Sequence, residues 1–390
     1  MNKLSTGFSL LILTLSYGCK KSFTPNVAAG NTNYLVVEGV INTGNDSTIF
    51  KLSRTVNLGI GTDSTFERGA QVIVENDQNA SYTVPEIGQG KYAAPALGLD
   101  NTHKYRLRVK TVDGKVYLSD FAAPTYTPPI DSIGFTINNK GIQIYANAHN
   151  ANNTTRYYRW DYVETWEFHA KYQSFYIYNG IDIVPRTPDQ NNIYYCYGNN
   201  TSTGIVLGST AALSQDVVYQ APITTVESTS EKIELEYSIL LHQYGLSKDA
   251  FTFYQTLKKN TEQIGSIFDA QPSTIDGNMH CITNPSVPVI GYITATNVQE
   301  KRIFIYNSQV PRLWQPTYPY NCPLDSLLFC RGKDCQNEVK DFLMVPNSPE
   351  IPVTTIPAKV GPGIIGYFGA GIICVDCTLR GVTKRPDFWK

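Results

Sequence analysis

The sequence predicts a mainly β protein with two immunoglobulin- or fibronectin-like β-sandwich domains, the second elaborated with long loops and one α-helix. Three observations predict this class. Apolar and polar residues alternate with a period of two over much of the chain, as half-buried strands require. Turn residues separate these runs, and one clear stretch, residues 247–263, has helical spacing. The 26 tyrosines also favour strands, because aromatic side chains pack well on a pleated surface.

Residues 1–18 are predicted to be a lipoprotein signal peptide. A mostly apolar stretch from Phe8 to Leu15 is too short to span a bilayer, and it is typical of the centre of a secretory signal. A small residue directly precedes Cys19, as lipoprotein processing requires; the alternative is an ordinary signal peptide with an incidental cysteine. Cys19 is therefore predicted to carry a membrane anchor, with residues 19–32 as a flexible tether.

Residues 33–124 are predicted to form the first sandwich, of roughly seven strands, which matches the size of an immunoglobulin-like domain. In the 105–109 segment, for example, Tyr, Leu and Val alternate with two arginines, which indicates one buried and one exposed face. Asp113-Gly114 lies between two such runs and predicts a hairpin turn. Pro124, Pro128 and Pro129 then break the pattern and predict a linker.

Residues 130–306 are predicted to form the second sandwich. The 158–162 and 233–241 segments alternate strongly, and the 291–295 and 302–306 segments are expected to be its closing strands. The 170–231 segment, rich in Tyr, Asn and turn residues, is expected to be an elaboration of this domain.

The helix predicted at residues 247–263 begins after Ser247, a good N-cap. Ala250, Phe253, Tyr254 and Leu257 share one face, which is expected to pack on the second sandwich. Residues 307–390 are rich in Pro and Cys and have little periodicity, so they are expected to wrap around the second domain.

Seven of the eight cysteines remain once Cys19 carries the lipid. An exported protein meets an oxidising compartment, where disulfides are the default, and an odd number leaves one thiol free or paired with another chain. Cys196 is expected to pair with Cys281, leaving two bonds among five C-terminal cysteines. A zinc site and a redox Cys-x-x-Cys pair are the alternatives. The C-terminal five are Cys322, Cys330, Cys335, Cys374 and Cys377.

Several segments together resemble one known family. The chain looks like the Bacteroidota lipoproteins grouped as domain of unknown function 4249 (DUF4249), over nearly its whole mature length. The segments that carry the likeness are Leu35-Val36-Val37-Glu38-Gly39, Tyr157-Tyr158-Arg159-Trp160-Asp161-Tyr162, Glu164-Thr165-Trp166, Tyr237-Ser238-Ile239-Leu240 with Gln243, Gly265-Ser266-Ile267-Phe268-Asp269 with Gln271-Pro272, Gly277-Asn278, Val289-Ile290-Gly291-Tyr292, Cys374-Val375-Asp376-Cys377 and Arg385-Pro386-Asp387-Phe388-Trp389.

The resemblance implies an outer-membrane lipoprotein, often encoded beside a TonB-dependent outer-membrane transporter, with no known enzyme activity and no agreed ligand. Related surface lipoproteins often carry acidic residues soon after the lipidated cysteine. Lys20-Lys21-Ser22-Phe23 has none, which weakens the case for display on the outer face of the membrane.

Two possible catalytic pairs are weak. Glu164 and Glu167 lie among aromatic residues, as glycosidase carboxylates do, but the exposed face of a strand explains them more simply. His280 adjoins Cys281, yet a cysteine assigned to a disulfide cannot act as a nucleophile. His242 continues an alternating strand, which indicates a structural role.

Aromatic residues crowd the predicted elaboration and are the binding candidates. Aromatic side chains on long loops can form a binding patch, or they can be the small core that holds the loops down. The candidates are Tyr172, Phe175, Tyr176, Tyr178, Tyr194, Tyr195 and Tyr197.

The expected function is therefore non-enzymatic. With 32 basic and 33 acidic residues and no basic patch, the composition argues against nucleic-acid binding. No cofactor or metal is expected. We expect a lipid-anchored accessory or binding partner of a TonB-dependent transporter. The alternatives are a structural or adhesive surface protein, and a glycan-acting hydrolase with an unrecognised site.

Overall fold

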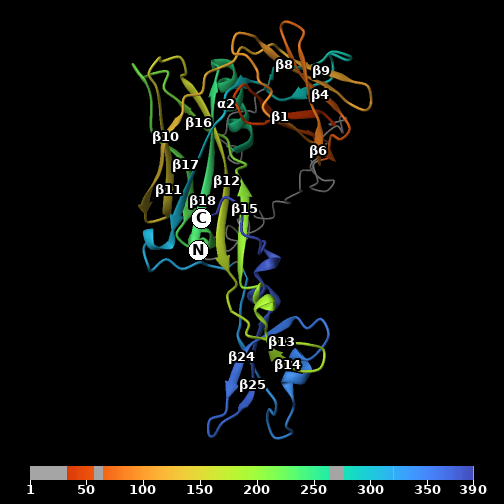
Figure 1. Cartoon of the computed structure of the whole chain (residues 1–390), viewed down its shortest axis with the longest axis vertical. Coiled ribbons are helices and arrows are strands. Elements are labelled where there is room, and N and C mark those ends of the chain that lie inside the picture. The colour runs from red at the N-terminus through yellow and green to blue at the C-terminus, as the bar shows by residue number, and fades with distance from the viewer. Residues whose placement is uncertain (1–32, 57–64, 263–275, 319, 390) are drawn as a thin grey trace, which may run out of the picture.

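The computed structural model describes residues 33–56, 65–262, 276–318 and 320–389. Two β-sandwiches lie side by side at one end of the molecule, and a smaller β module extends from the second of them (Figure 1). The mainly β class is confirmed. The predicted signal peptide 1–18, the tether 19–32 with Cys19, and the Gly265–Pro272 segment lie outside the described residues.

Two sheets pack face to face in the N-terminal sandwich. Its strands are β1 Leu35–Asn42, β2 Thr48–Arg54, β3 Thr65–Phe66, β4 Gln71–Asn76, β5 Ser81–Val84, β6 Glu86–Gly88, β7 Lys91–Ala94, β8 Tyr105–Lys110, β9 Val116–Ser119, β19 Met279–Cys281, β20 Val289–Ile290 and β21 Ala295–Thr296. One sheet has the order β20-β1-β2-β7-β6, with β3 and β21 at its margins, and the other has the order β19-β9-β8-β4-β5. As the alternation predicts, Leu107 and Val109 are buried, opposite Phe50 and Leu52 of the other sheet.

The boundary predicted between the two sandwiches is wrong for one segment. The chain returns to the N-terminal sandwich after the helix, where β19 pairs with β9, and β20 and β21 pair with β1. Ile293 and Ala295, expected in the second domain, are buried in the first core. Strands of two or three residues carry too little periodicity to indicate which sheet edge they join, so the sequence could not decide this.

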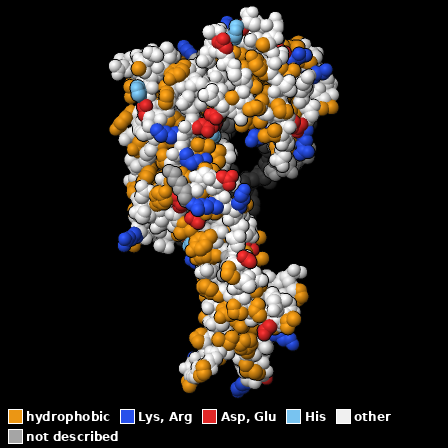
Figure 2. Space-filling model, viewed as in Figure 1, with side chains coloured by type: hydrophobic (Ala, Val, Ile, Leu, Met, Phe, Trp, Pro, Cys, Tyr) orange, Lys and Arg blue, Asp and Glu red, His pale blue; other side chains and the backbone are white. Residues whose placement is uncertain are grey.

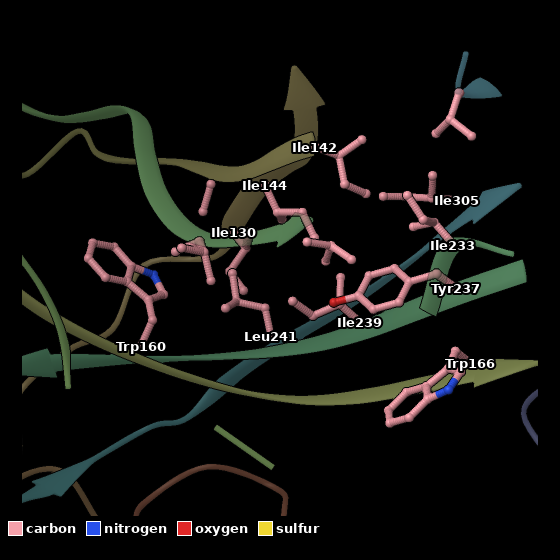
Figure 3. Packing of buried hydrophobic residues seen from close by; sticks show 14 of the residues in the cluster. Ile130, Ile142, Ile144, Trp160, Trp166, Ile233, Tyr237, Ile239, Leu241 and Ile305 are labelled. Carbon is pink, nitrogen blue, oxygen red and sulfur yellow. The ribbon is translucent and has the colours of Figure 1, made fainter. Parts of the chain in front are cut away.

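The second sandwich is built from longer strands. They are β10 Ile130–Asn138, β11 Gly141–Asn150, β12 Tyr157–His169, β15 Tyr195–Thr201, β16 Val206–Ser209, β17 Asp216–Glu227, β18 Glu236–Leu246 and β22 Gln299–Tyr306, with short helical turns at Glu231–Ile233 and Asn307–Gln309. One sheet has the order β10-β11-β17, and the other has β15-β12-β18-β22 with β16 also paired to β12. Ile142 and Ile144 face Ile239 and Leu241 across the core, beside Trp160 (Figure 3).

The 170–231 segment is only partly an elaboration. β15, β16 and β17 are integral strands of the second sandwich, whereas residues 176–191 belong to the smaller module. Exposed Tyr and Asn side chains on these strands hid their alternation in the sequence.

The predicted helix is α2, Lys248–Glu262. Ser247 caps it through its side-chain oxygen, which accepts a hydrogen bond from Ala250 N at 3.2 Å. Ala250, Phe253 and Tyr254 are buried against β12, β16 and β18, as expected for a helix that packs on the second sandwich. Tyr292 of the N-terminal sandwich joins the same cluster, so α2 contacts both domains.

A distal module accounts for much of the C-terminal region, which was expected to wrap the second domain. Its strands and turns are β13 Tyr176–Tyr178, β14 Ile183–Pro185, β23 Asp325–Leu328, β24 Glu350–Pro357, β25 Ile364–Gly371, α3 Ile372–Val375 and the helical turns Pro188–Asn191 and Val339–Leu343. The next turn, Cys377–Leu379, packs on β15 of the second sandwich. β23-β25-β24 form one sheet, with the β13–β14 hairpin beside β24 (Figure 1). Prolines in β24 and glycines in β25 disguised these strands in the sequence.

The last residues do return to the second sandwich. Trp389 donates a hydrogen bond from its indole Nε1 to Glu236 Oε2 at 2.8 Å, and its ring packs on Tyr197 and Phe304. Val382 bridges to Tyr197 through the backbone. This segment therefore covers the part of the outer face of the β15-β12-β18-β22 sheet that carries Tyr197, Glu236 and Phe304.

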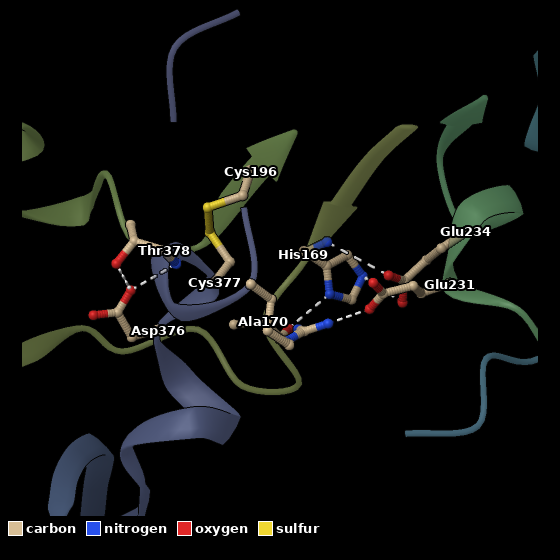
Figure 4. The surroundings of a disulfide bond; sticks show 9 residues. His169, Ala170, Cys196, Glu231, Glu234, Asp376, Cys377 and Thr378 are labelled. Atoms are coloured by element: carbon tan, nitrogen blue, oxygen red, sulfur yellow. Dashed lines mark hydrogen bonds and ion pairs between the residues drawn. A yellow bond between two sulfur atoms is a disulfide. The ribbon is translucent and has the colours of Figure 1, made fainter. Parts of the chain in front are cut away.

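Among the described residues six of the seven cysteines form three disulfides, which confirms the prediction of disulfide bonding. They are Cys196–Cys377, Cys322–Cys374 and Cys330–Cys335. The predicted Cys196–Cys281 bond is wrong, because Cys281 is a buried free thiol in the first core while Cys196 lies in the second. The Cys196–Cys377 bond fastens the start of the C-terminal tail to β15 (Figure 4).

Candidate binding cleft between the two sandwiches

A cavity of about 1090 Å³ lies between the two sandwiches. β1 and β2 line one wall, β12, β18 and β22 line the opposite wall, and α2 contributes a third side. Figure 2 shows the surface hollowed between the two domains, with charged side chains of both signs around it. Its volume lies slightly above the roughly 300–1,000 Å³ that is typical of small-molecule sites.

Strand alternation presents charged side chains to this cleft. In β12, Trp160 points into the sandwich core, so its neighbours Arg159 and Asp161 point to the outer face. The strand register places Asp161 opposite His242 of β18, and His242 opposite Glu300 of β22. Three titratable residues thus form a row across three adjacent strands.

The row is held by ion pairs. His242 Nδ1 lies 2.7 Å from Asp161 Oδ1, and its Nε2 lies 3.3 Å from Glu300 Oε1. Burial alone would lower the pKa of His242, but the hydrogen bond and charge of Asp161, with the charge of Glu300, outweigh burial and raise it above 6.5. Burial opposes ionisation of Asp161, yet His242 and Arg159 lower the pKa of its carboxyl.

Arg159 is enclosed by the same wall. Its guanidinium lies over the Tyr244 ring at 4.3 Å and the Tyr254 ring at 4.9 Å, and its Nη2 is 3.3 Å from Asp161 Oδ2. Its Nε is buried without a hydrogen-bond acceptor. Burial, followed by the charge of Asp161, raises the pKa of Tyr244. These groups form a packed set whose positions are mutually fixed.

Buried hydrogen bonds fix the angle between the sandwiches. The linker residue Thr127 exchanges two hydrogen bonds with Asn297, at 2.7 and 2.9 Å, and its hydroxyl accepts one from Gly245 N at 2.8 Å. Gln243 donates to Pro128 O at 2.8 Å. Because the linker is bonded to β18 and to the returning chain, the cleft is held open before any ligand arrives.

Close backbone contact shapes the N-terminal wall. Gly291 adopts φ +155°, and a Cβ there would lie 2.5 Å from Val37 O. The next residue, Tyr292, packs its ring 5.2 Å from Phe253 of α2. Residues 289–292 therefore position one side of the cleft.

The predicted aromatic binding residues lie elsewhere and are dispersed. The exposed ones are Phe175 and Tyr195. Tyr178 donates to Gly180 O, and Tyr172 donates to Cys322 O at 2.9 Å. The remaining three pack on other rings: Tyr176 on Tyr367, Tyr194 on His169, and Tyr197 on Trp389. Tyr195 packs edge-on against Tyr194, so six of these seven side chains have packing or hydrogen-bonding roles, and binding by Phe175 and Tyr195 stays a prediction.

Glu164 and Glu167 do not form a pair. Glu164 is 2% exposed and faces the core, where it accepts from Lys232 Nζ at 2.6 Å and Tyr237 OH at 2.8 Å. Glu167 faces the opposite side, where burial and the charge of Glu236 raise its pKa. The interpretation of both carboxylates as exposed strand residues is wrong for Glu164, and opposite faces prevent the two from flanking one glycosidic bond.

The other roles considered for the cysteines require residues that do not lie together in the structure. Cys374 and Cys377 bond to different partners, so the Cys-x-x-Cys motif is not one redox disulfide. No group suited to hold a metal is found among the described residues. His280 is exposed and lies 3.2 Å from Asp120, whereas Cys281 is buried on the other face of β19, so they form no dyad.

The row formed by Asp161, His242 and Glu300 was not predicted from the sequence. Arg159 and Asp161 were recognisable as polar alternates between aromatic core residues. His242 was assigned to a strand correctly, but the cross-strand partner that gives it a charged environment is set by sheet order alone. Nothing in the sequence indicated that Glu300 lies beside His242, because the chain passes through β19, β20 and β21 of the first sandwich before it forms β22.

The fold and cleft define a two-sandwich protein with a preformed interdomain site. A family model described as domain of unknown function (DUF4249) matches residues 20–302, which is 283 of 390 residues. The chain belongs to this family. Comparison with curated proteins finds no match. Within the described residues, no helix has the length and apolar character needed to cross a membrane.

Proposed function

We propose that this protein is a lipid-anchored outer-membrane protein that captures a small ligand in the interdomain cleft and assists a TonB-dependent transporter. The observation that carries the proposal is the cavity of about 1090 Å³ whose walls are fixed relative to each other. A rigid, preformed cleft loses little conformational entropy on binding. Its charged and aromatic lining supplies directional contacts.

The anchor rests on the N-terminal sequence. The apolar stretch that ends just before Cys19, followed by a polar tether, favours a lipoprotein of the kind known in Bacteroidota. The transporter partner rests on the resemblance to such lipoproteins.

A non-catalytic role fits the chemistry of the cleft. Arg159 and His242 are each paired with a carboxylate, and Asp161 is shared by both. Charged groups that packing and ion pairs hold in fixed positions can supply directional contacts to a bound molecule.

A ligand-retention experiment tests the capture role. The purified soluble domain is incubated with a low-molecular-weight extract of the producing cells and examined by native mass spectrometry. We expect retention of a small molecule by the wild type and its loss in Thr203→Trp, which places a large ring on the cleft lining. Tyr219→Trp, an exposed position on β17 outside the lining, is the matched control. Retention by neither wild type nor control contradicts ligand capture.

Affinity purification tests the transporter partner. Tagged protein is isolated from outer membranes in mild detergent, and co-purifying proteins are identified by mass spectrometry. A stoichiometric TonB-dependent barrel supports the proposal. Failure to recover any barrel even after cross-linking contradicts it.

A structural or adhesive role is the second candidate, favoured by the apolar surface of the distal module (Figure 2). Val360, in the β24–β25 turn, is 91% exposed, and Ile181, in the β13–β14 turn, is 84% exposed. Exposed apolar patches often mark sites of association. If Val360→Asp abolishes co-purification of any partner while ligand retention is unchanged, the distal module is the docking element.

A further inference from the structure

We propose that the ligand of the interdomain cleft is an organic cation that carries a protonated amine. The inference rests on the proposed capture function and adds the chemical class of the ligand.

The positive groups of the cleft are already neutralised. Arg159 is paired with Asp161, and its guanidinium lies over the rings of Tyr244 and Tyr254. Lys51 lies 3.8 Å from Glu38 across the β1–β2 pair. His242 stands between two carboxylates. An anionic ligand would therefore have to displace a carboxylate from each cation that it contacted.

Negative charge is in excess. Glu38, Asp46, Asp161, Glu262 and Glu300 line the cavity together with Lys51 and Arg159. Lys258, beside the lining, lies 3.8 Å from Glu262, so two negative charges remain, or one when His242 is protonated. Glu300 keeps an exposed carboxylate beyond its single contact with His242. Low-dielectric walls focus such a field, so the cleft attracts cations.

The wall already binds one cation in this way. Arg159 shows that tyrosine faces and a carboxylate at this position accommodate a delocalised positive charge. The rings of Phe253 and Tyr292 also line the cavity. A ligand ammonium held by a carboxylate and one of these rings would have the same two kinds of contact.

Titration calorimetry with three matched peptides tests the charge requirement. The probes are Nα-acetyl-tri-lysine amide, its fully Nε-acetylated form, which carries no amine, and Nα-acetyl-tri-glutamate amide, each measured at low and at moderate salt. We expect the tri-lysine peptide to bind at least tenfold more tightly than its Nε-acetylated form, with affinity falling as salt rises, and the tri-glutamate peptide not to bind. Equal affinity for the lysine and acetyl-lysine peptides overturns the proposal.

Variants locate the binding. Glu300→Gln and Asp46→Asn should each weaken tri-lysine binding about three- to tenfold, as expected for one lost charge contact near a protein surface. Glu227→Gln, an exposed carboxylate on β17 outside the cavity, should leave affinity unchanged. If Glu300→Gln and Asp46→Asn together bind tri-lysine as well as the wild type, the cleft is not the cation site and the proposal fails.

The retention experiment separates this inference from the capture function. A positively charged compound retained by the wild type and lost in Thr203→Trp supports both. A retained compound that is neutral or anionic overturns the cation class and leaves capture standing. If the wild type retains no small molecule, the capture function is contradicted. The proposed cation class is then overturned too, because it rests on that function.

Discussion

Asp161 and His242 lie directly opposite each other on β12 and β18, with Asp161 Oδ1 2.7 Å from His242 Nδ1. The pair faces the cleft, and Glu300 contacts the other nitrogen of the ring. Because the two carboxylates raise the pKa of His242, protonation of this side chain is linked to folding stability.

The first prediction concerns pH. The folded-state pKa of His242 exceeds its unfolded value of about 6.5, so its stabilisation is complete below pH 6.5 and is lost as pH rises through the folded pKa. The wild type should therefore lose unfolding free energy between about pH 6.5 and the folded pKa, and His242→Gln should flatten this dependence. Urea unfolding across pH 5.5 to 9 measures it.

His149 supplies the control. Asp131 also raises its pKa, but this pair is fully exposed and is screened by solvent. His149→Gln should keep most of the pH dependence. The same slope in His242→Gln and in the wild type would show that another group is responsible.

The second prediction compares two disulfides. By loop entropy, the Cys196–Cys377 bond, which spans 181 residues, stabilises by about 5 kcal/mol, and the Cys330–Cys335 bond, which spans 5 residues, by about 2 kcal/mol. Cys196→Ser/Cys377→Ser should therefore lower the unfolding free energy more than Cys330→Ser/Cys335→Ser. Denaturant titration of both double variants measures the difference, and equal losses would argue against loop closure as the cause.

The third prediction concerns the buried ion pair of the second core. Lys232→Met leaves the Glu164 carboxylate buried with its charge unpaired, and should cost about 3 kcal/mol. Adding Glu164→Gln removes the charge and should recover part of this loss. The double-mutant cycle, read by chemical denaturation, checks both steps; no recovery in the double variant would mean that the charge is not what destabilises.

The fourth prediction concerns the linker. Gln243 accepts from Trp160 Nε1 at 2.9 Å and donates to Pro128 O, so Gln243→Leu leaves both groups buried without partners. The loss should be about 2 kcal/mol, since each unsatisfied group costs about 1 kcal/mol or more. We also expect a broader distribution of interdomain angles by small-angle scattering. Gln71→Leu, at an exposed end of β4, is the control and should change neither quantity.

The fifth prediction concerns the anchor. Cys19→Ala should move the protein from the membrane fraction to the soluble fraction, because the polar tether alone has no affinity for lipid. Fractionation followed by immunoblotting checks this result. Persistent membrane association of Cys19→Ala would falsify the lipid-anchor prediction.

The sequence alone determined the β class, the helix and much of the cores. Period-two alternation in β8, β12 and β18 identified which side chains are buried, because residues that alternate in type also alternate in direction. The caps and apolar face of α2 were equally local signals. The oxidised state of the paired cysteines followed from their number and the predicted export.

Tertiary structure alone decided what depends on distant pairing. The return of β19, β20 and β21 to the first sandwich placed Cys281 in a different core from Cys196, so the disulfide pairing could not be read from spacing. The cleft has the same origin. Asp161, His242 and Glu300 become neighbours only through the order β12-β18-β22, and sheet order is set by packing between segments that no local pattern relates.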